Sequence, residues 1–144
     1  MKTLLSTLTA LILLATGAFA ATGWSDDYQK AQAAAKAENK LVLLDFTGSD
    51  WCGWCMKLDK EVFSQKAFKD YAKDKLVLVT VDFPQTKFLS KKVKDQNAKL
   101  QSQYQVKGYP TIIVLNGDGK KVGQLGYMEG GPTAFLGELD KLKK

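Results

Sequence analysis

The order of hydrophobic and polar residues along the chain predicts four helices and four strands. Two apolar runs, residues 41–46 and 76–82, contain so few polar residues that we expect central strands buried on both faces. Apolar residues at helical spacing in a polar background predict amphipathic helices that pack on a sheet through one face. The predicted helices cover residues 25–38, 52–75, 89–106 and 130–142.

Turn signals near the end of the chain complete the element order. Asn-Gly and Asp-Gly at residues 116–119 separate the strand-like runs 111–115 and 120–127, which predicts a hairpin of two antiparallel strands. The resulting order is helix, strand, helix, strand, helix, strand, strand, helix. We expect an α/β fold with a mixed central β-sheet flanked by helices, because helices are available to cover both sheet faces.

Short polar residues mark the expected ends of the helices. Ser25, which is followed by two acidic residues, is predicted to cap the first helix, and Asn39 and Lys40 are predicted to end it. Ser64 is predicted to cap a second helical piece within residues 52–75.

The first twenty residues have the pattern of a secretory signal peptide. Lys2 precedes an apolar run over residues 4–15, and small residues at positions 18–20 predict cleavage after Ala20. The apolar run is shorter than the roughly 20 residues that a membrane span needs, so we expect no stable membrane insertion after cleavage, although an uncleaved tether stays open. Residues 21–144 would then form a single domain in the periplasm or another exported location.

Charge and composition narrow the classes of function. The 144 residues include 15 acidic residues, 21 basic residues that are all lysine, and no histidine, for a net charge of +6. Nucleic-acid-binding surfaces usually include arginine or aromatic residues between the basic ones, so we interpret the lysines as solvated surface and expect no nucleic-acid partner. The sequence contains no nucleotide, flavin or metal motif, and we expect no cofactor.

Both cysteines of the chain lie in one short motif, Trp51-Cys52-Gly53-Trp54-Cys55. Two thiols separated by two residues at the start of a helix can close and reopen a small disulfide ring. Cys52 would lie at the helix N-terminus, where free backbone N–H groups favour a thiolate, which makes it the candidate nucleophile. Cys55, one turn further along, is expected to be more buried and to attack a mixed disulfide on Cys52 as the resolving thiol.

Other uses of the cysteine pair have different requirements. A structural zinc site needs about four Cys or His ligands, and covalent haem attachment needs a histidine where Met56 lies, so the sequence meets neither requirement. An inert disulfide would close so short a loop that it removes little chain entropy, and redox chemistry is therefore the preferred interpretation. Binding of Cu(I) by the two thiolates stays open.

Together these features resemble the thioredoxin family. The motif at residues 51–55, followed about fifty residues later by Gly108-Tyr109-Pro110-Thr111, is specific for this fold. The stretches at residues 46–52 and 81–85 further resemble the periplasmic DsbH-type disulfide reductases. The resemblance covers nearly all of residues 21–144, and it implies a thioredoxin fold.

The resemblance also implies roles for residues outside the cysteine pair. Pro110 matches the family's cis-proline, whose loop faces the reactive cysteine, so Tyr109 and Pro110 are implied to line a substrate groove. Asp45 matches the buried family acid, although this chain has one extra residue between that acid and the motif. A carboxylate in an apolar strand would have a raised pKa, and Asp45 is implied to take the proton from Cys55.

Two tryptophans flank the nucleophile, and the nearby charges differ from the family pattern. Trp51 is expected to shape the rim of the site, and Trp54, in place of the proline of common thioredoxins, is expected to cover the disulfide or contact a substrate. Lys57 is expected to point toward water. The lysine that usually partners the family acid is replaced by an apolar residue near Leu78.

The function implied by the resemblance is that of an exported thiol:disulfide oxidoreductase, which uses Cys52 and Cys55 to reduce protein disulfides. Its electrons would come from an unidentified thiol donor, and the protein would be a monomer. Two alternatives stay open. One is a disulfide isomerase, and the other, from a different class, is a copper-thiolate carrier or a partner-binding module with little turnover.

Overall fold

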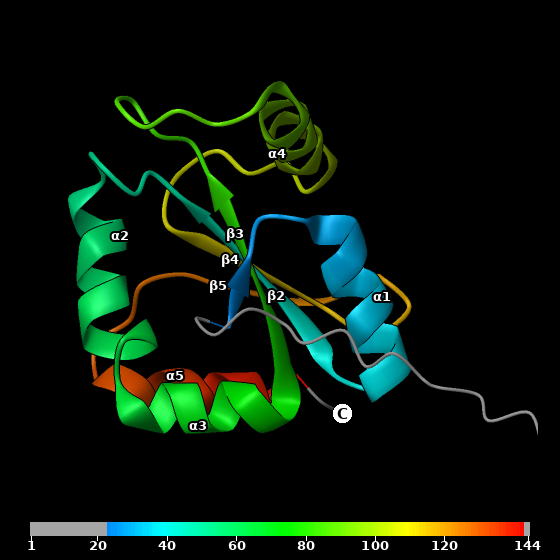
Figure 1. Cartoon of the computed structure of the whole chain (residues 1–144). Coiled ribbons are helices and arrows are strands. Elements are labelled where there is room, and N and C mark those ends of the chain that lie inside the picture. Colours follow the sequence, from blue (N-terminus) through cyan, green and yellow to red (C-terminus); the bar gives the residue numbers. More distant parts are fainter. Residues whose placement is uncertain (1–22, 143–144) are drawn as a thin grey trace, which may run out of the picture.

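A mixed five-stranded sheet lies at the centre of the computed structural model, which describes residues 23–142 (Figure 1). The strand order is β1-β3-β2-β4-β5, in which β3 is parallel to β1 and β2, and β4 is antiparallel to β2 and β5. The strands are β1 (Trp24–Ser25), β2 (Leu41–Thr47), β3 (Leu76–Asp82), β4 (Thr111–Leu115) and β5 (Lys121–Leu125). The predicted signal peptide and its cleavage site lie outside the described residues.

Helices cover both faces of this sheet, which confirms the predicted α/β architecture (Figure 1). The helices are α1 (Tyr28–Glu38), α2 (Gly53–Leu58), α3 (Lys66–Lys75), α4 (Lys91–Gln103) and α5 (Gly131–Lys141). A π-helical turn, η1 (Asp59–Phe63), continues α2. None of the helices within residues 23–142 is long and apolar enough to cross a membrane.

The side chains of β2 point alternately to the two faces of the sheet, and they contribute to a separate core on each face. Val42, Leu44 and Phe46 pack with residues of α1 and α4, whereas Leu43 packs with residues of α2, η1, α3 and α5. Because successive side chains of a strand point to opposite faces, Asp45 lies on the same face as Leu43. The strand therefore directs this acid toward the layer that contains α2.

The structure corrects both predicted serine caps. Ser25 belongs to the short strand β1, and the side chain of Asp27 caps α1 instead, accepting a hydrogen bond from the Lys30 N–H at 3.1 Å. Ser64 follows the end of η1, and α3 begins after Gln65 without a side-chain cap. The prediction missed β1 because a two-residue strand has no periodicity, and it is recognisable only from its pairing with β3.

An aromatic cluster stabilises the core that lies between the sheet and the layer of α2, α3 and α5. Phe135 of α5 is fully buried, and its ring centroid lies 5.6 Å from that of Phe63 and 6.2 Å from that of Phe68. We expect Phe135→Ala to lower the free energy of unfolding by about 3–5 kcal/mol, because it removes buried apolar area and leaves a cavity. Urea denaturation of the disulfide-bonded protein measures this loss.

The same substitution at an exposed phenylalanine is the matched control. Phe88 is 88% exposed, so Phe88→Ala should change the free energy of unfolding by less than about 0.5 kcal/mol. Equal losses in the two variants would contradict the described core.

Candidate active site

The cysteine motif lies where β2 passes through a tight loop into α2. Residue 52 is the N-cap of α2, and its N–H donates to the Gly48 carbonyl at 2.8 Å, which closes the loop. Gly48 is required here because a Cβ at this position would collide with the Trp51 indole. The loop thus delivers Cys52 to the beginning of the helix, as the sequence predicts.

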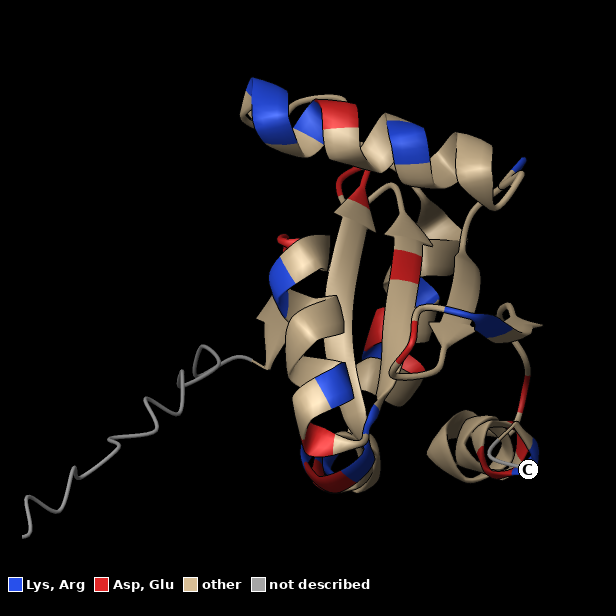
Figure 2. Ribbon diagram, turned by 90° about the vertical axis from the view of Figure 1, so that its right-hand side faces the viewer, with Lys and Arg blue, Asp and Glu red and all other residues tan. Residues whose placement is uncertain are grey.

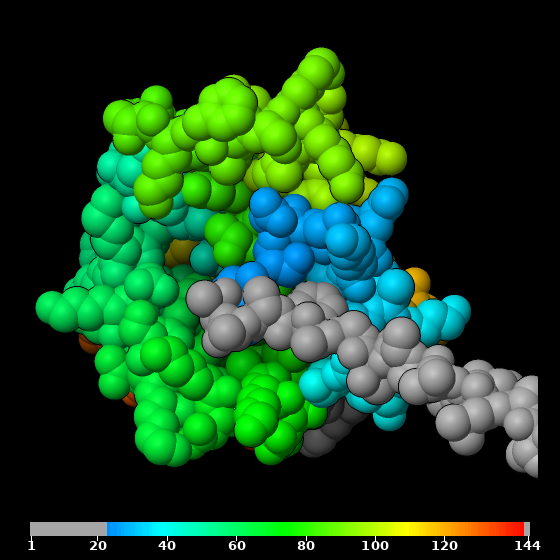
Figure 3. All heavy atoms as spheres, viewed as in Figure 1, coloured from blue at the N-terminus to red at the C-terminus, as the bar shows by residue number. Residues whose placement is uncertain are grey.

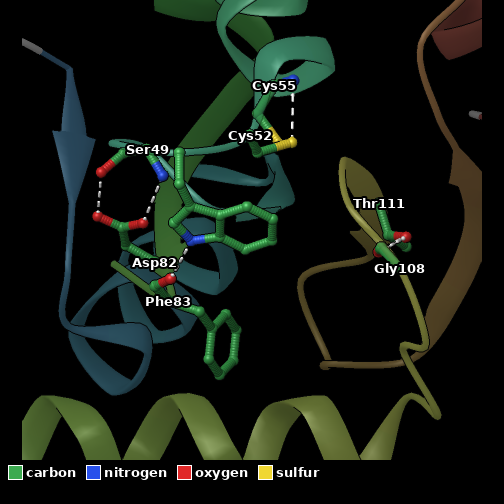
Figure 4. Close-up of a disulfide and its surroundings, with 8 residues drawn as sticks. Ser49, Cys52, Cys55, Asp82, Phe83, Gly108 and Thr111 are labelled. Atoms are coloured by element: carbon green, nitrogen blue, oxygen red, sulfur yellow. Dashed lines mark hydrogen bonds between the residues drawn. A yellow bond between two sulfur atoms is a disulfide. The ribbon is translucent and has the colours of Figure 1, made fainter. Parts of the chain in front are cut away.

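Cys52 and Cys55 form a disulfide, with their Cα atoms 5.2 Å apart (Figure 4). The Cys52 Sγ also accepts a hydrogen bond from the Cys55 backbone N–H at 3.2 Å. A donor aimed at this sulfur stabilises negative charge on it once the disulfide is reduced. The geometry supports Cys52 as the sulfur that ionises more readily.

Burial does not distinguish the two cysteines, contrary to the prediction that Cys55 would be the more buried. Each is 6% exposed, because the disulfide holds the two residues side by side at the surface of the helix. Their surroundings differ instead. Cys55 lines a cavity of about 340 Å³ that extends beneath the motif, and this cavity is also lined by Asp45.

Asp45 lies in the cavity beneath Cys55 without a compensating partner. Its Oδ1 is buried and has no hydrogen-bond partner, and within residues 23–142 its carboxylate forms no ion pair. Burial, together with the nearby charges of Asp59 and Asp82, raises the pKa of Asp45 to about 7. A carboxylate with this pKa can accept and release a proton near neutral pH.

The strand register identifies the residue beside this acid. Asp45 of β2 is opposite Thr80 of β3, whereas Leu78 is opposite Leu43. The residue directly opposite Asp45 is therefore a threonine, two positions beyond Leu78, and Thr80 lines the same cavity as Asp45. In Figure 3 the surface is hollowed between the blue chain around β1 and the green chain of α2, where this cavity opens.

The loop that contains Pro110 faces the disulfide from the other side (Figure 4). The Tyr109–Pro110 peptide bond is cis, and the Thr111 hydroxyl donates to the Gly108 carbonyl at 2.7 Å. The Tyr109 hydroxyl accepts a hydrogen bond from the Gln101 side chain at 2.6 Å. The structure thus brings the two predicted groove residues to the same site as the cysteines.

Trp51 and Trp54 are both exposed beside the disulfide, with exposed fractions of 42% and 58%. The Trp51 indole N–H donates to the Phe83 carbonyl at 2.8 Å, and its ring lies edge-on to Tyr109 at 5.8 Å. The Trp54 ring lies 5.0 Å from that of Tyr127, in the loop between β5 and α5. Each tryptophan is therefore held by a contact from a distant part of the chain.

Lys57 is exposed at the surface, as expected, and its ammonium group also lies over aromatic rings. Its Nζ is 5.1 Å from the Trp54 ring centroid and 5.0 Å from that of Tyr127, and it is 3.9 Å from the Glu61 carboxylate. The neighbouring Tyr127 side chain raises the pKa of Lys57. No sequence signal pointed to Tyr127, because it lies in a loop some seventy residues from the motif.

A second set of contacts that the sequence reasoning missed joins the loop before the motif to the end of β3. The Ser49 backbone N–H donates to Asp82 Oδ1 at 2.9 Å, and the Ser49 hydroxyl donates to Asp82 Oδ2 at 2.5 Å (Figure 4). Both residues are ordinary polar loop or strand-end residues in the sequence, so only the fold pairs them. This network fixes the approach of the chain to Cys52.

Within residues 23–142, no group of three or more His, Cys, Asp or Glu side chains is placed to hold a metal ion. The described arrangement consists of a disulfide, a half-buried carboxyl group with a raised pKa and a facing loop with aromatic residues. Chemically, it can exchange thiols and disulfides and move one proton between Cys55 and Asp45.

Comparison with known proteins gives consistent matches over nearly all of the described chain. The family model of a thioredoxin-like domain matches residues 28–143. The chain is 33% identical over 119 residues to the disulfide bond reductase DsbH of Chlamydia pneumoniae, covering 83% of this chain and 72% of that protein. It is 31% identical over 122 residues to the thiol:disulfide interchange protein DsbD of Pasteurella multocida, covering 80% of this chain but only 19% of that protein.

Solved structures agree with these matches. A structure described as DsbH oxidoreductase superposes with a TM-score of 0.79 at 30% sequence identity, covering 95% of this chain and 92% of that one. The similarity therefore extends over the whole sheet and its helices, including the loops that carry the cysteines and Pro110.

Proposed function

The chain belongs to the thioredoxin-like family and is a thiol:disulfide oxidoreductase, and we propose that it works as an exported reductase of protein disulfides. The direction of the reaction is supported by the similarity to a protein named as a disulfide bond reductase. Export is supported by the charged, apolar and small-residue pattern of the first twenty residues. A monomer is proposed as the working state.

The first step of the reaction uses the dithiol form. The Cys52 thiolate attacks one sulfur of the client disulfide, the client S–S bond breaks, and the other client sulfur leaves as a thiolate. Trp51, Trp54, Tyr109 and Pro110 surround the cysteines and are proposed to bind the client chain. The product of this step is a mixed disulfide between Cys52 and the client.

The second step releases the client. Cys55 loses its proton to the Asp45 carboxylate, and the Cys55 thiolate attacks Cys52 Sγ, which breaks the mixed disulfide and expels the second client thiolate. Two electrons have then passed to the client, and Cys52 and Cys55 are joined as in the described structure. Because the sequence has no nucleotide or flavin motif, an external thiol donor is proposed to reduce this disulfide again.

The shared cavity of Cys55 and Asp45, combined with the N–H donor on Cys52 Sγ, is the observation that carries this proposal. It supports different roles for the two sulfurs, which an inert disulfide would not need. Reduction of insulin disulfides by the dithiol form tests it, with a thiol donor present to regenerate the protein. Tight stoichiometric Cu(I) binding by a sample without turnover would instead favour the copper-thiolate carrier.

The ionisation of Cys52 gives a separate prediction. In the reduced protein, we expect the rate of Cys52 alkylation to reach half of its maximum at a pH below about 8.5, the ordinary value for a free cysteine. The reason is the N–H donor and the helix start at its sulfur. Iodoacetamide labelling followed by mass spectrometry across pH measures this, and a midpoint at or above that of a free cysteine would contradict the assignment of the nucleophile.

A further inference from the structure

Large apolar side chains are exposed in only two places on the part of the chain that the structure describes. Trp51, Trp54 and Met56 surround the disulfide. The fourth exposed apolar side chain is that of Phe88, which is 88% exposed and lies in the connection between β3 and α4. Residues 84–89 of this connection are named the Phe88 loop. Exposed apolar side chains that gather at one end of a molecule are typical of an interaction surface.

The Phe88 loop is fastened to the residue that precedes the redox motif. The Asp50 carboxylate accepts hydrogen bonds from the backbone N–H groups of Gln85, Thr86 and Lys87 at 2.9, 2.7 and 3.1 Å, and from the Thr86 hydroxyl at 2.6 Å. These hydrogen bonds, led by that from the Thr86 hydroxyl, hold the pKa of Asp50 well below its ordinary value. Asp50 lies two residues before Cys52, so the exposed phenylalanine has a defined position relative to the nucleophile.

The base of the loop is continuous with the predicted client groove. Phe83 directly precedes the loop, and its carbonyl accepts the Trp51 indole N–H. The Phe83 ring also lies 5.4 Å from the Tyr109 ring, next to Pro110. Figure 1 shows the loop above the beginning of α2, at the end of the molecule that carries the motif. An extended client chain bound at the groove could therefore continue onto Phe88.

The sequence around Phe88 is rich in lysine. Residues 87–94 contain four lysines and no acidic residue. The Nζ of Lys94 lies 5.6 Å from the centroid of the Phe88 ring. The side chains of Lys91 and Lys92 are largely exposed, and they form surface ion pairs with Asp95 at 2.5 Å and with Asp27 at 3.4 Å. Figure 2 shows these blue segments in the first turns of α4, at the top of the molecule. A partner that binds here needs an apolar side chain together with negative charge.

We propose that the Phe88 loop and the first turn of α4 form a second client-binding site, which takes an apolar side chain flanked by acidic residues of the disulfide-bearing polypeptide. This inference rests on the proposed function, because the client is the same molecule whose disulfide reaches Cys52. A rigid exposed aromatic side chain contributes contact area at little cost in conformational entropy, which suits it to this role.

Direct binding tests the proposal without requiring turnover. The probe is a fluorescent synthetic peptide with one disulfide, one phenylalanine and three glutamates, titrated onto the Cys52→Ser/Cys55→Ser protein. Adding Phe88→Ala should weaken binding at least about fivefold, whereas Phe88→Leu should retain most of the affinity. A matched peptide with alanine and glutamine at those positions should bind weakly and should not respond to Phe88→Ala.

The charge component has its own matched pair of variants. A triple variant with glutamine at Lys91, Lys92 and Lys94 should bind the peptide about threefold or more weakly, and its affinity should depend less on salt concentration. The same triple change at Lys66, Lys69 and Lys73, on α3 at the opposite end of the molecule (Figure 1), should leave the affinity unchanged.

The outcomes separate this inference from the proposed function. An absence of measurable peptide binding, or equal binding with and without Phe88→Ala, would overturn the second binding site even if the wild-type protein reduces disulfides. A wild-type protein that binds the peptide in the predicted way but reduces no disulfide would overturn the proposed reductase and keep the site.

Discussion

Replacing Cys52 by serine is expected to lower the rate of insulin disulfide reduction by roughly 10³-fold or more. A serine hydroxyl at the start of α2 stays protonated near neutral pH, so it cannot attack a disulfide even though the Cys55 N–H still reaches position 52. The rate is measured with excess thiol donor, and circular dichroism checks that the variant is folded.

Cys55→Ser supplies the informative counterpart. This variant should still form the mixed disulfide on Cys52, because the nucleophile and its N–H donor are intact, but it should not release the client. Non-reducing electrophoresis and mass spectrometry should detect the trapped adduct. Trapping by Cys52→Ser instead, or by both variants equally, would show that the roles of the two sulfurs are reversed or shared.

Asp45→Asn is expected to slow release of the client from the mixed disulfide by about 10²-fold near pH 7 while leaving its formation largely unchanged. The amide cannot accept the proton of Cys55, whereas Asp45 can, since burial raises its pKa to about 7. Rapid-mixing kinetics with a chromogenic disulfide separate the two steps. Equal slowing of both steps would mean that Asp45 acts on the nucleophile rather than on Cys55.

The same substitution should change how stability depends on pH. The folded protein keeps the Asp45 proton up to a pKa of about 7, whereas the unfolded chain releases it near the ordinary value of 3.8. Stability therefore falls as pH rises between these two values, and the loss levels off above the folded-state pKa. The difference between the two pKa values corresponds to a loss of at most about 4 kcal/mol in the free energy of unfolding.

Urea denaturation of the oxidised protein at pH 4.5 and pH 8 measures this effect, because the cysteines do not titrate in the disulfide. At each pH, the free energy of unfolding of the wild type is subtracted from that of Asp45→Asn. This difference should be larger at pH 8 than at pH 4.5 by about 3 kcal/mol, in favour of the variant. Asp74→Asn makes the same chemical change at an exposed position of α3 and should show no such difference. If the two variants behaved alike, the raised pKa that follows from the half-buried, unpartnered Asp45 carboxyl group would be refuted.

Most of the secondary structure could be predicted because its signals are local. The apolar runs of β2 and β3, the Asn-Gly and Asp-Gly hairpin and the spacing of apolar residues in α4 lie within single short stretches. The errors arose where local signals compete or are too short. Asp27 competes with Ser25 as the cap of α1, α3 has no side-chain cap, and β1 is defined by its partner strand alone.

The candidate site was predicted in part. Cys52 and Cys55 were evident from their spacing, and Asp45, Tyr109 and Pro110 came from the family resemblance. The structure places these last three residues near the disulfide that the two cysteines form. The catalytic role of Asp45 and the groove residues stay predictions that the variants above test. Thr80 escaped detection because strand register follows from pairing across the sheet, and sequence spacing does not report it.

The sequence by itself determined the redox chemistry of this protein, since the reactivity of two thiols three positions apart at a helix start depends on residues that are adjacent in the sequence. Only the tertiary structure decided the surroundings of that chemistry. It brought an unpartnered carboxyl group beneath Cys55, Tyr127 against Trp54, and the Phe88 loop onto Asp50. Such contacts join segments tens of residues apart, and they arise from packing and strand register, which no local pattern encodes.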